Sequence, residues 1–200
     1  MNPKNKFSRQ WSWEDLRPEW HGIIPFQWLS RMRPIACLAL GTLVATCGAG
    51  APTGGDDEVV LSFGAARLLS GQPLAAGGLE YRCAKNWRGV HPYLAAHGVE
   101  DGAFYLGGGL LYRWELPRRW RLTLSSGPGY YDRQHSPRDL GSTLEFYSNV
   151  ELARRLTGGC QIGLSFGHVS NGGFGNKNPG SETLRLVFVQ SIDRWRRRWR

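Results

Sequence analysis

The sequence predicts an all-β protein, an eight-stranded antiparallel transmembrane β-barrel of the outer-membrane type. Three observations lead to this fold class. No apolar run in the 200 residues reaches the ~20 that a spanning helix needs, and only 20% of the residues are charged. Beyond residue 52, stretches of alternating apolar and polar residues recur between turn signals. Short connections alternate with long ones between these stretches, as in barrels that span an outer membrane.

The N-terminal quarter carries an export signal. A mostly apolar run of 13 residues, Ile35 to Cys47, follows Arg31 and Arg33 and is followed by small residues. A positive flank, a short apolar core and a small-residue exit are typical of a secretory signal peptide, here residues 32–51. Residues 1–31 then read as a misassigned upstream extension, with a genuine Trp-rich extension as the alternative. A buried core helix is the structural alternative for the apolar run.

Cleavage after residue 51 would leave two of the four cysteines, Cys83 and Cys160. One disulfide between them is compatible with an oxidising compartment, but the spacing does not decide whether it forms. No CxxC pair or Cys/His cluster is present, so a structural zinc site is not expected.

The barrel domain is predicted over residues 52–193. Alternation and turn residues place its strands near residues 58–69, 77–86, 90–98, 103–115, 119–131, 142–155, 160–170 and 182–192. Eight is the smallest usual number for a closed outer-membrane barrel. The connections at 86–89, 116–118 and 157–159 are tight, whereas 132–141 and 171–181 are long and rich in Gly, Pro, Asn and Asp. We expect the long connections outside the cell and both termini in the periplasm.

A soluble barrel of the lipocalin type is the main structural alternative, and the two faces of the strands distinguish it. In the strand over 160–170, Leu164 and Phe166 lie on one face, whereas Gln161 and Ser165 lie on the other. A soluble barrel needs a hydrated exterior. The small, weakly polar face suits a narrow lumen, so we expect the apolar face to meet lipid. Four charged residues fall on the lumen side of their strands and are expected to pair with one another: Arg113, Arg121, Glu145 and Glu151.

Three residues at one edge of the predicted wall could carry chemistry. His168 and Ser170 share the outward face of one strand, and Glu182 begins the next, antiparallel strand on the same face. A serine, a base within reach and a carboxylate that orients the base is the arrangement that activates a hydroxyl nucleophile. The alternative is a set of interfacial polar side chains solvated by lipid headgroups. His91 and His97 are six residues apart on one strand, too far for one metal ion, and are expected to be structural or surface residues.

His168, Ser170, Asn171 and Glu182, in an exported eight-stranded barrel with Glu fourteen positions after His, resemble the lipid A 3-O-deacylase (PagL) family. The specific part of the resemblance is the block 166–182. The resemblance implies a serine esterase of the outer membrane that removes the 3-O-linked 3-hydroxyacyl chain from lipid A of lipopolysaccharide. It assigns Ser170 as nucleophile, His168 as base and Glu182 as the acid that orients the base. The active site would face the outer leaflet.

By the same resemblance, the Gly173 amide and the Asn178 side chain would hold the oxyanion. Asn171 and Asn176 are alternative donors in the same loop. The chemistry requires neither metal nor other cofactor, and nucleic acid is not an expected partner. The formation of a homodimer is left open. The alternative function is a non-catalytic outer-membrane barrel with a structural or lipopolysaccharide-binding role.

Much of the formal charge of +9 lies at the C-terminus, where Asp193 to Arg200 holds five arginines and one aspartate. A nucleic-acid-binding domain would spread its basic residues over a folded face. Residues 194–200, a basic Trp/Arg tail, are expected either to lie at an anionic membrane boundary or to be solvated. The tail departs from the family pattern, because Arg200 replaces the usual terminal aromatic residue.

Overall fold

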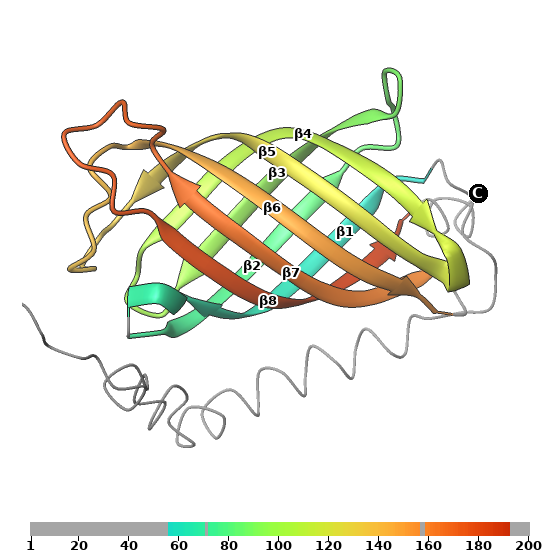
Figure 1. Ribbon diagram of the computed structural model, residues 1–200, viewed down its shortest axis with the longest axis horizontal. Helices are drawn as coiled ribbons and strands as arrows, with labels where there is room; N and C mark the ends of the chain where they lie inside the picture. Colours follow the sequence, from blue (N-terminus) through green and yellow to red (C-terminus); the bar gives the residue numbers. More distant parts are fainter. Residues whose placement is uncertain (1–55, 71, 157–158, 193–200) are drawn as a thin grey trace, which may run out of the picture.

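The computed structural model describes residues 56–70, 72–156 and 159–192. Within these ranges eight antiparallel strands form a closed barrel, in which each strand pairs with the next and β8 pairs with β1 (Figure 1). The strands are β1 (Glu58–Ala66), β2 (Leu74–Arg82), β3 (Val90–Val99), β4 (Phe104–Leu116), β5 (Trp120–Asp132), β6 (Leu144–Arg155), β7 (Cys160–Ser170) and β8 (Ser181–Ser191). Two single 3-10 turns, η1 (Leu68–Ser70) and η2 (Pro117–Arg119), complete the elements.

The described residues contain no helix with the length and apolar character to cross a membrane. The predicted upstream extension, signal peptide and basic tail all lie outside the described residues.

The predicted fold class is confirmed, and seven of the eight predicted strands match with shifts of a few residues at their ends. The prediction for the second strand, 77–86, was wrong by three to four residues, because β2 runs from Leu74 to Arg82. Gly77 and Gly78 open the predicted strand, whereas β2 already begins three residues earlier, at Leu74. A Cβ on Gly78 would stand 2.2 Å from His97 Nδ1, so a glycine is needed where the His97 ring fills the lumen.

The first strand also ends earlier than predicted. The prediction extended it to residue 69, but the strand stops at Ala66. Arg67 has a φ of 62°, which lies in the left-handed region and breaks the extended conformation.

The connections divide between the two ends of the barrel. The tight connections β2–β3, β4–β5 and β6–β7 lie at the end where β1 begins and β8 finishes, here called the terminal end. The long connections β5–β6 and β7–β8 lie at the other end, here called the loop end, together with β1–β2 and β3–β4 (Figure 1). The candidate site residues of β7 and β8 are thereby placed at the loop end.

Ion pairs fill the lumen between the strands. Arg82 donates to Glu151 at 2.6 and 3.0 Å and to Glu80 at 2.8 and 3.1 Å, and all three residues are buried. A second group joins Glu58 to Arg121 at 2.6 Å and to Arg113 at 3.1 Å. Arg113, Arg121 and Glu151 are therefore ion-paired in the lumen, but their partners are Glu58 and Arg82, so the prediction that they pair with one another was wrong. The prediction was also wrong for Glu145, which is fully buried and whose carboxylate oxygens have no hydrogen-bonding partner among the described residues.

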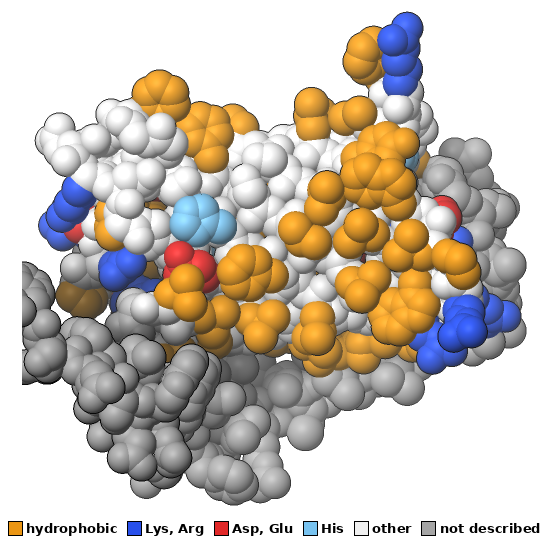
Figure 2. Space-filling model, viewed as in Figure 1, with side chains coloured by type: hydrophobic (Ala, Val, Ile, Leu, Met, Phe, Trp, Pro, Cys, Tyr) orange, Lys and Arg blue, Asp and Glu red, His pale blue; other side chains and the backbone are white. Residues whose placement is uncertain are grey.

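The outer surface of the wall is apolar. Hydrophobic side chains form a broad band over the strands, and the Lys and Arg side chains seen in this view lie toward the two ends (Figure 2). The band includes Leu94, Leu106, Leu110, Leu124, Val150, Leu152, Leu164, Phe166, Leu184 and Leu186, each at least 38% exposed. Tyr130 near the loop end and Trp114 near the terminal end mark aromatic edges of the band, as in membrane barrels. This exterior matches a bilayer and does not match the hydrated surface of a lipocalin.

Candidate active site

His168 and Glu182 face each other on the outer wall of the barrel. They are directly opposed in the antiparallel register of β7 and β8. His168 Nδ1 lies 3.4 Å from Glu182 Oε1. The carboxylate is only 15% exposed and the imidazole 45%, so the carboxylate is tucked against the wall while part of the ring stays accessible. A carboxylate at Nδ1 fixes the ring and leaves Nε2 for proton transfer.

Gly180 determines where the other edge of the His168 ring lies. Its φ of +61° is left-handed, and a Cβ added there would be 2.6 Å from His168 Cε1 and 3.2 Å from Nε2. Val169 pairs with Ser181, so one further step in the register places Gly180 level with Ser170. The Nε2 edge of the ring is therefore directed toward the level of Ser170.

Ser170 lies two residues from His168 on the same outward face of β7 and is half-buried. No hydrogen bond joins its hydroxyl to the imidazole among the described residues. Such bonds are often long without substrate and shorten in the reactive complex. The structure thus brings the three predicted triad residues to one edge, with the base and the acid in contact and the nucleophile beside them.

The β7–β8 loop begins with a tight turn from Asn171 to Phe174, closed by a Phe174 N–H bond to the Asn171 carbonyl at 3.1 Å. Gly172 and Gly173 have φ values of 64° and 86°. Two successive left-handed residues form a type I′ turn, which favours glycine at both positions. The chain therefore reverses direction directly after the candidate nucleophile.

Asn171 holds this loop together from inside. It is fully buried, and its Nδ2 donates to the Leu140 carbonyl at 2.9 Å and the Lys177 carbonyl at 2.8 Å. Its Oδ1 accepts the Gly173 N–H at 2.9 Å. The Asn171 side chain and the Gly173 amide, two of the predicted oxyanion donors, are therefore already engaged with each other or with the loop.

Asn178, the third predicted oxyanion donor, is arranged differently. Its Oδ1 accepts the Asn171 N–H at 3.2 Å, which fixes the side chain. Asn178 is exposed to solvent. The Nδ2 group has no partner in the described part of the chain. Asn178 is thus held by its acceptor while its donor remains available.

The β5–β6 loop is bonded to the β7–β8 loop. Arg138 Nη2 donates to the carbonyls of Pro179 at 3.2 Å and Gly180 at 2.8 Å. Lys177 pairs with Asp139 at 2.9 Å. Hydrogen bonds from Lys177 and from the Gly141 amide hold the pKa of Asp139 below its usual range. The backbone that positions Gly180 against His168 is therefore tied to a second loop.

The same contacts continue to the other two loops. Arg67 Nη2 donates to Asp101 at 2.5 Å and to the Ser136 hydroxyl at 2.6 Å, and that hydroxyl also accepts the Arg138 N–H at 3.0 Å. Burial alone would raise the pKa of Asp101, but hydrogen bonds with Ser136 and Ala103 and the charge of Arg67 lower it. All four connections of the loop end are thus joined by polar contacts.

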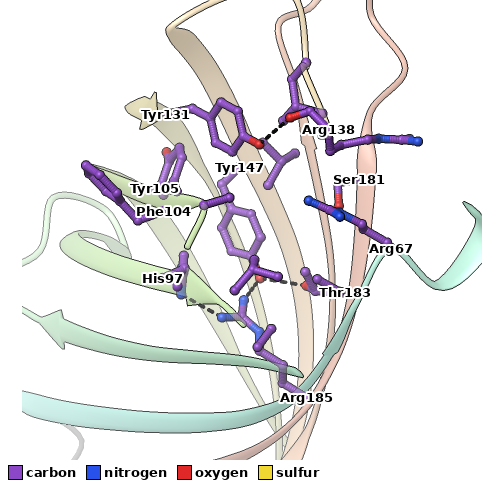
Figure 3. A pocket seen from close by; sticks show the side chains of 17 residues that line it. Arg67, His97, Phe104, Tyr105, Tyr131, Arg138, Tyr147, Ser181, Thr183 and Arg185 are labelled. Atoms are coloured by element: carbon purple, nitrogen blue, oxygen red, sulfur yellow. Dashed lines mark hydrogen bonds between the residues drawn. The ribbon is translucent and has the colours of Figure 1, made fainter. Parts of the chain in front are cut away.

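A cavity of ≈ 50 Å³ lies on the inner side of the wall, near the loop end. Figure 3 shows its lining, in which Arg185 bonds to His97 at 2.6 Å and to the Tyr147 hydroxyl, which in turn contacts Thr183 at 3.3 Å. Residues on β7 and β8 that face this cavity, such as Val169 and Thr183, alternate with the outward His168 and Glu182. The cavity has room for a few water molecules, and the candidate triad lies on the opposite, outer side of the wall.

The remaining histidines and cysteines of interest have structural surroundings. His91 Nδ1 bonds to the Cys83 carbonyl at 3.0 Å, and His97 lies in the lumen, as expected for both histidines. Cys83 carries a free thiol, so it is not joined to Cys160. No group of three or more His, Cys, Asp or Glu side chains suited to a metal ion occurs in the part of the chain that the structure describes.

Sequence reasoning missed two residues that shape the site. Gly180 was counted only as part of a Gly-rich loop, although its left-handed φ permits the close approach of His168. Arg138 was not singled out, because its partners are carbonyl groups some forty residues away. The one sequence signal for this part of the site was Gly180, a single glycine two residues before Glu182.

Comparisons with known proteins show which sequences and structures the chain is similar to. The family model for "Lipid A 3-O-deacylase (PagL)" matches residues 71–189. A curated relative, "Lipid A deacylase PagL" of Bordetella bronchiseptica, is 26% identical over 80 residues, which are 40% of this chain and 45% of the relative. The match therefore spans less than half the length of that protein.

Two solved structures are similar to this chain. The crystal structure of the outer membrane enzyme PagL has a TM-score of 0.55 and 19% identity over 68% of this chain and 99% of that one. The structure of Neisserial surface protein A has a TM-score of 0.49 and 9% identity, covering 71% of this chain and 99% of that one.

Proposed function

Because the chain belongs to the lipid A 3-O-deacylase (PagL) family, we propose that it is an outer-membrane esterase that removes the 3-O-linked 3-hydroxyacyl chain from lipid A. The observation that carries this proposal is the contact between His168 and Glu182 beside Ser170, on the outward face of the barrel. An inward-facing triad would have no access to a lipid. This triad borders the apolar band, where the acyl chains of a membrane lipid lie.

The proposed reaction begins at Ser170. His168 Nε2 takes the hydroxyl proton as Ser170 Oγ attacks the ester carbonyl carbon, and Glu182 stabilises the imidazolium through Nδ1–H. The carbonyl π electrons move to oxygen and form a tetrahedral oxyanion. When that intermediate collapses, the sugar oxygen leaves with the proton from His168. Water then hydrolyses the acyl-serine by the same steps and releases a 3-hydroxy fatty acid.

Asn178 is our proposed side-chain donor to the oxyanion, because its Nδ2 group is unengaged while its Oδ1 is held by the Asn171 amide. The Gly173 amide is the proposed second donor, and it would exchange its bond to Asn171 Oδ1 for one to the oxyanion. Asn171 itself, buried and bonded to two carbonyls, acts by holding the loop.

The proposed orientation places the loop end at the outer leaflet. Lipid A has its sugar at the membrane surface and its acyl chains in the hydrocarbon. A site at the edge of the apolar band on the loop side meets the ester that joins these parts. The terminal end, with its tight connections, would then face the periplasm.

The lipid A of cells with and without the protein tests the proposal. The mass spectrum should show a species lighter by one 3-hydroxyacyl group only where the protein is present. An unchanged lipid A profile, from a folded protein that is accessible at the cell surface, would favour the non-catalytic barrel. Alkaline release of the remaining ester-linked chains identifies which position lost its acyl group.

A further inference from the structure

A row of polar side chains crosses the outer wall at the height of His168. It consists of Ser126 on β5, Ser148 on β6, His168 on β7 and Glu182 on β8, and we call it the polar row. Each member is directly opposed to the next in the strand register, Ser126 to Ser148, Ser148 to His168 and His168 to Glu182. The row ends on β4, where Leu110 opposes Ser126. The candidate base and acid are therefore one half of a longer polar feature.

The two serines of the polar row lie inside the apolar band. On β6, outward Phe146 and Val150 flank Ser148, and on β5, outward Leu124 and Pro128 flank Ser126. Both serines are exposed on the wall. A hydroxyl group that faces hydrocarbon is costly unless it has a hydrogen-bonding partner.

Ser126 and Ser148 use only part of their hydrogen-bonding capacity on each other. Their Oγ atoms are 2.9 Å apart, and either can be the donor. Two hydroxyl groups carry two O–H donors, and this contact uses one of them. One O–H donor and several lone pairs remain, directed at whatever lipid lies against the wall. A plain acyl chain offers no group to match them, whereas a hydroxylated acyl chain does.

We propose that Ser148, supported by Ser126, binds the 3-hydroxyl group of the acyl chain that the site cleaves and so selects 3-hydroxyacyl esters over unsubstituted ones. This inference rests on the proposed function. Ser170 opposes Phe146, so Ser148 lies one strand across from the nucleophile and two residues further toward the terminal end. The side-chain bases of such a diagonal pair are about 7–8 Å apart.

The shape of the substrate fits this offset. An acyl chain whose ester carbonyl is at Ser170 and whose sugar is at the membrane surface runs from the loop end toward the terminal end. The chain therefore passes the height of His168 and Ser148. Its hydroxyl group is on the second carbon beyond the carbonyl, within the space between Ser170 and Ser148. The hydroxyl can donate to one serine oxygen and accept from the unused O–H.

The test compares two synthetic substrates, a monosaccharide lipid A precursor with a 3-O-linked 3-hydroxyacyl chain and the same molecule with an unsubstituted chain of equal length. The wild type should prefer the hydroxylated substrate in kcat/KM by about three- to tenfold, the worth of one neutral hydrogen bond. Ser148→Ala should lower kcat/KM for that substrate by the same factor and leave the other unchanged. Ser126→Ala should have a smaller effect in the same direction.

Val150→Ala is the matched control, because it shortens an outward side chain on the same strand without removing a hydroxyl group. It should keep the wild-type preference between the two substrates. A wild type that cleaves both substrates equally, or a Ser148→Ala variant that loses activity equally on both, would overturn the inference and leave the proposed function standing. A wild type that cleaves neither substrate would overturn the proposed function, and this inference with it.

Discussion

Gly180→Ala should damage the site through a contact that the structure defines. Gly180 has a φ of +61°, and a residue with a Cβ in this region costs about 1–2 kcal/mol. The new Cβ would also stand 2.6 Å from His168 Cε1, so the ring must turn away from its place beside Glu182. Because a shift of about 1 Å in a catalytic group can cost about 10²-fold, we expect kcat/KM to fall by about that factor.

Gly102→Ala separates the two effects. Gly102 has a φ of +92°, so the substitution carries a similar backbone penalty, but the added Cβ would meet only Gln134 Cβ, at an ordinary 3.7 Å. The assay is fatty acid release from lipid A by the purified, folded variants, with thermal unfolding measured in the same detergent. Both variants should lose similar stability, and Gly102→Ala should stay near wild-type activity. Equal activity of the two variants would refute the reasoning about His168.

Three further predictions concern the lumen, the loops and the chemistry. Arg82→Met removes the partner of buried Glu80 and Glu151, and should lower the free energy of unfolding in urea by about 3–5 kcal/mol. Lys177→Ala, which breaks an exposed pair, should change this free energy far less, and equal losses would contradict the assigned lumen pairs. The lowered pKa of Asp101 means that its contact with Arg67 stabilises the protein above the ordinary value of about 3.9 and is lost as the pH falls through the lowered one. An NMR titration should place the Asp101 midpoint below that ordinary value, and a midpoint at or above it would contradict this contact. Deacylation by the purified protein should continue in a chelator, whereas loss of activity that a metal ion restores would contradict a metal-free triad.

The fold was predictable because alternation along a strand records which face meets lipid. Gln161 and Ser165 point inward while Leu164 and Phe166 point outward, as their spacing requires. The failures came where a partner far along the chain decides the local structure. β2 begins at Leu74 and not at residue 77, because Ala76 pairs with Val99 of the neighbouring strand.

The candidate site was predictable for a related reason, and its surroundings were not. The spacing of His168, Ser170 and Glu182 across one hairpin sets their common face, so sequence alone could bring them together. The Arg138 contacts with Pro179 and Gly180 join two loops whose relative position no periodicity encodes. The lack of a partner for Glu145 among the described residues likewise depends on contacts across the lumen that no periodicity encodes.

The most direct test of the account compares purified wild-type protein with Ser170→Ala on lipid A in detergent. The wild type should release a 3-hydroxy fatty acid, and Ser170→Ala, folded to the same barrel by circular dichroism, should release it at least about 10³-fold more slowly. His168→Ala should fall with it, while Glu182→Ala retains more activity because the acid only orients the base. Release at the wild-type rate by Ser170→Ala would show that this outward edge of the barrel does not carry the reaction.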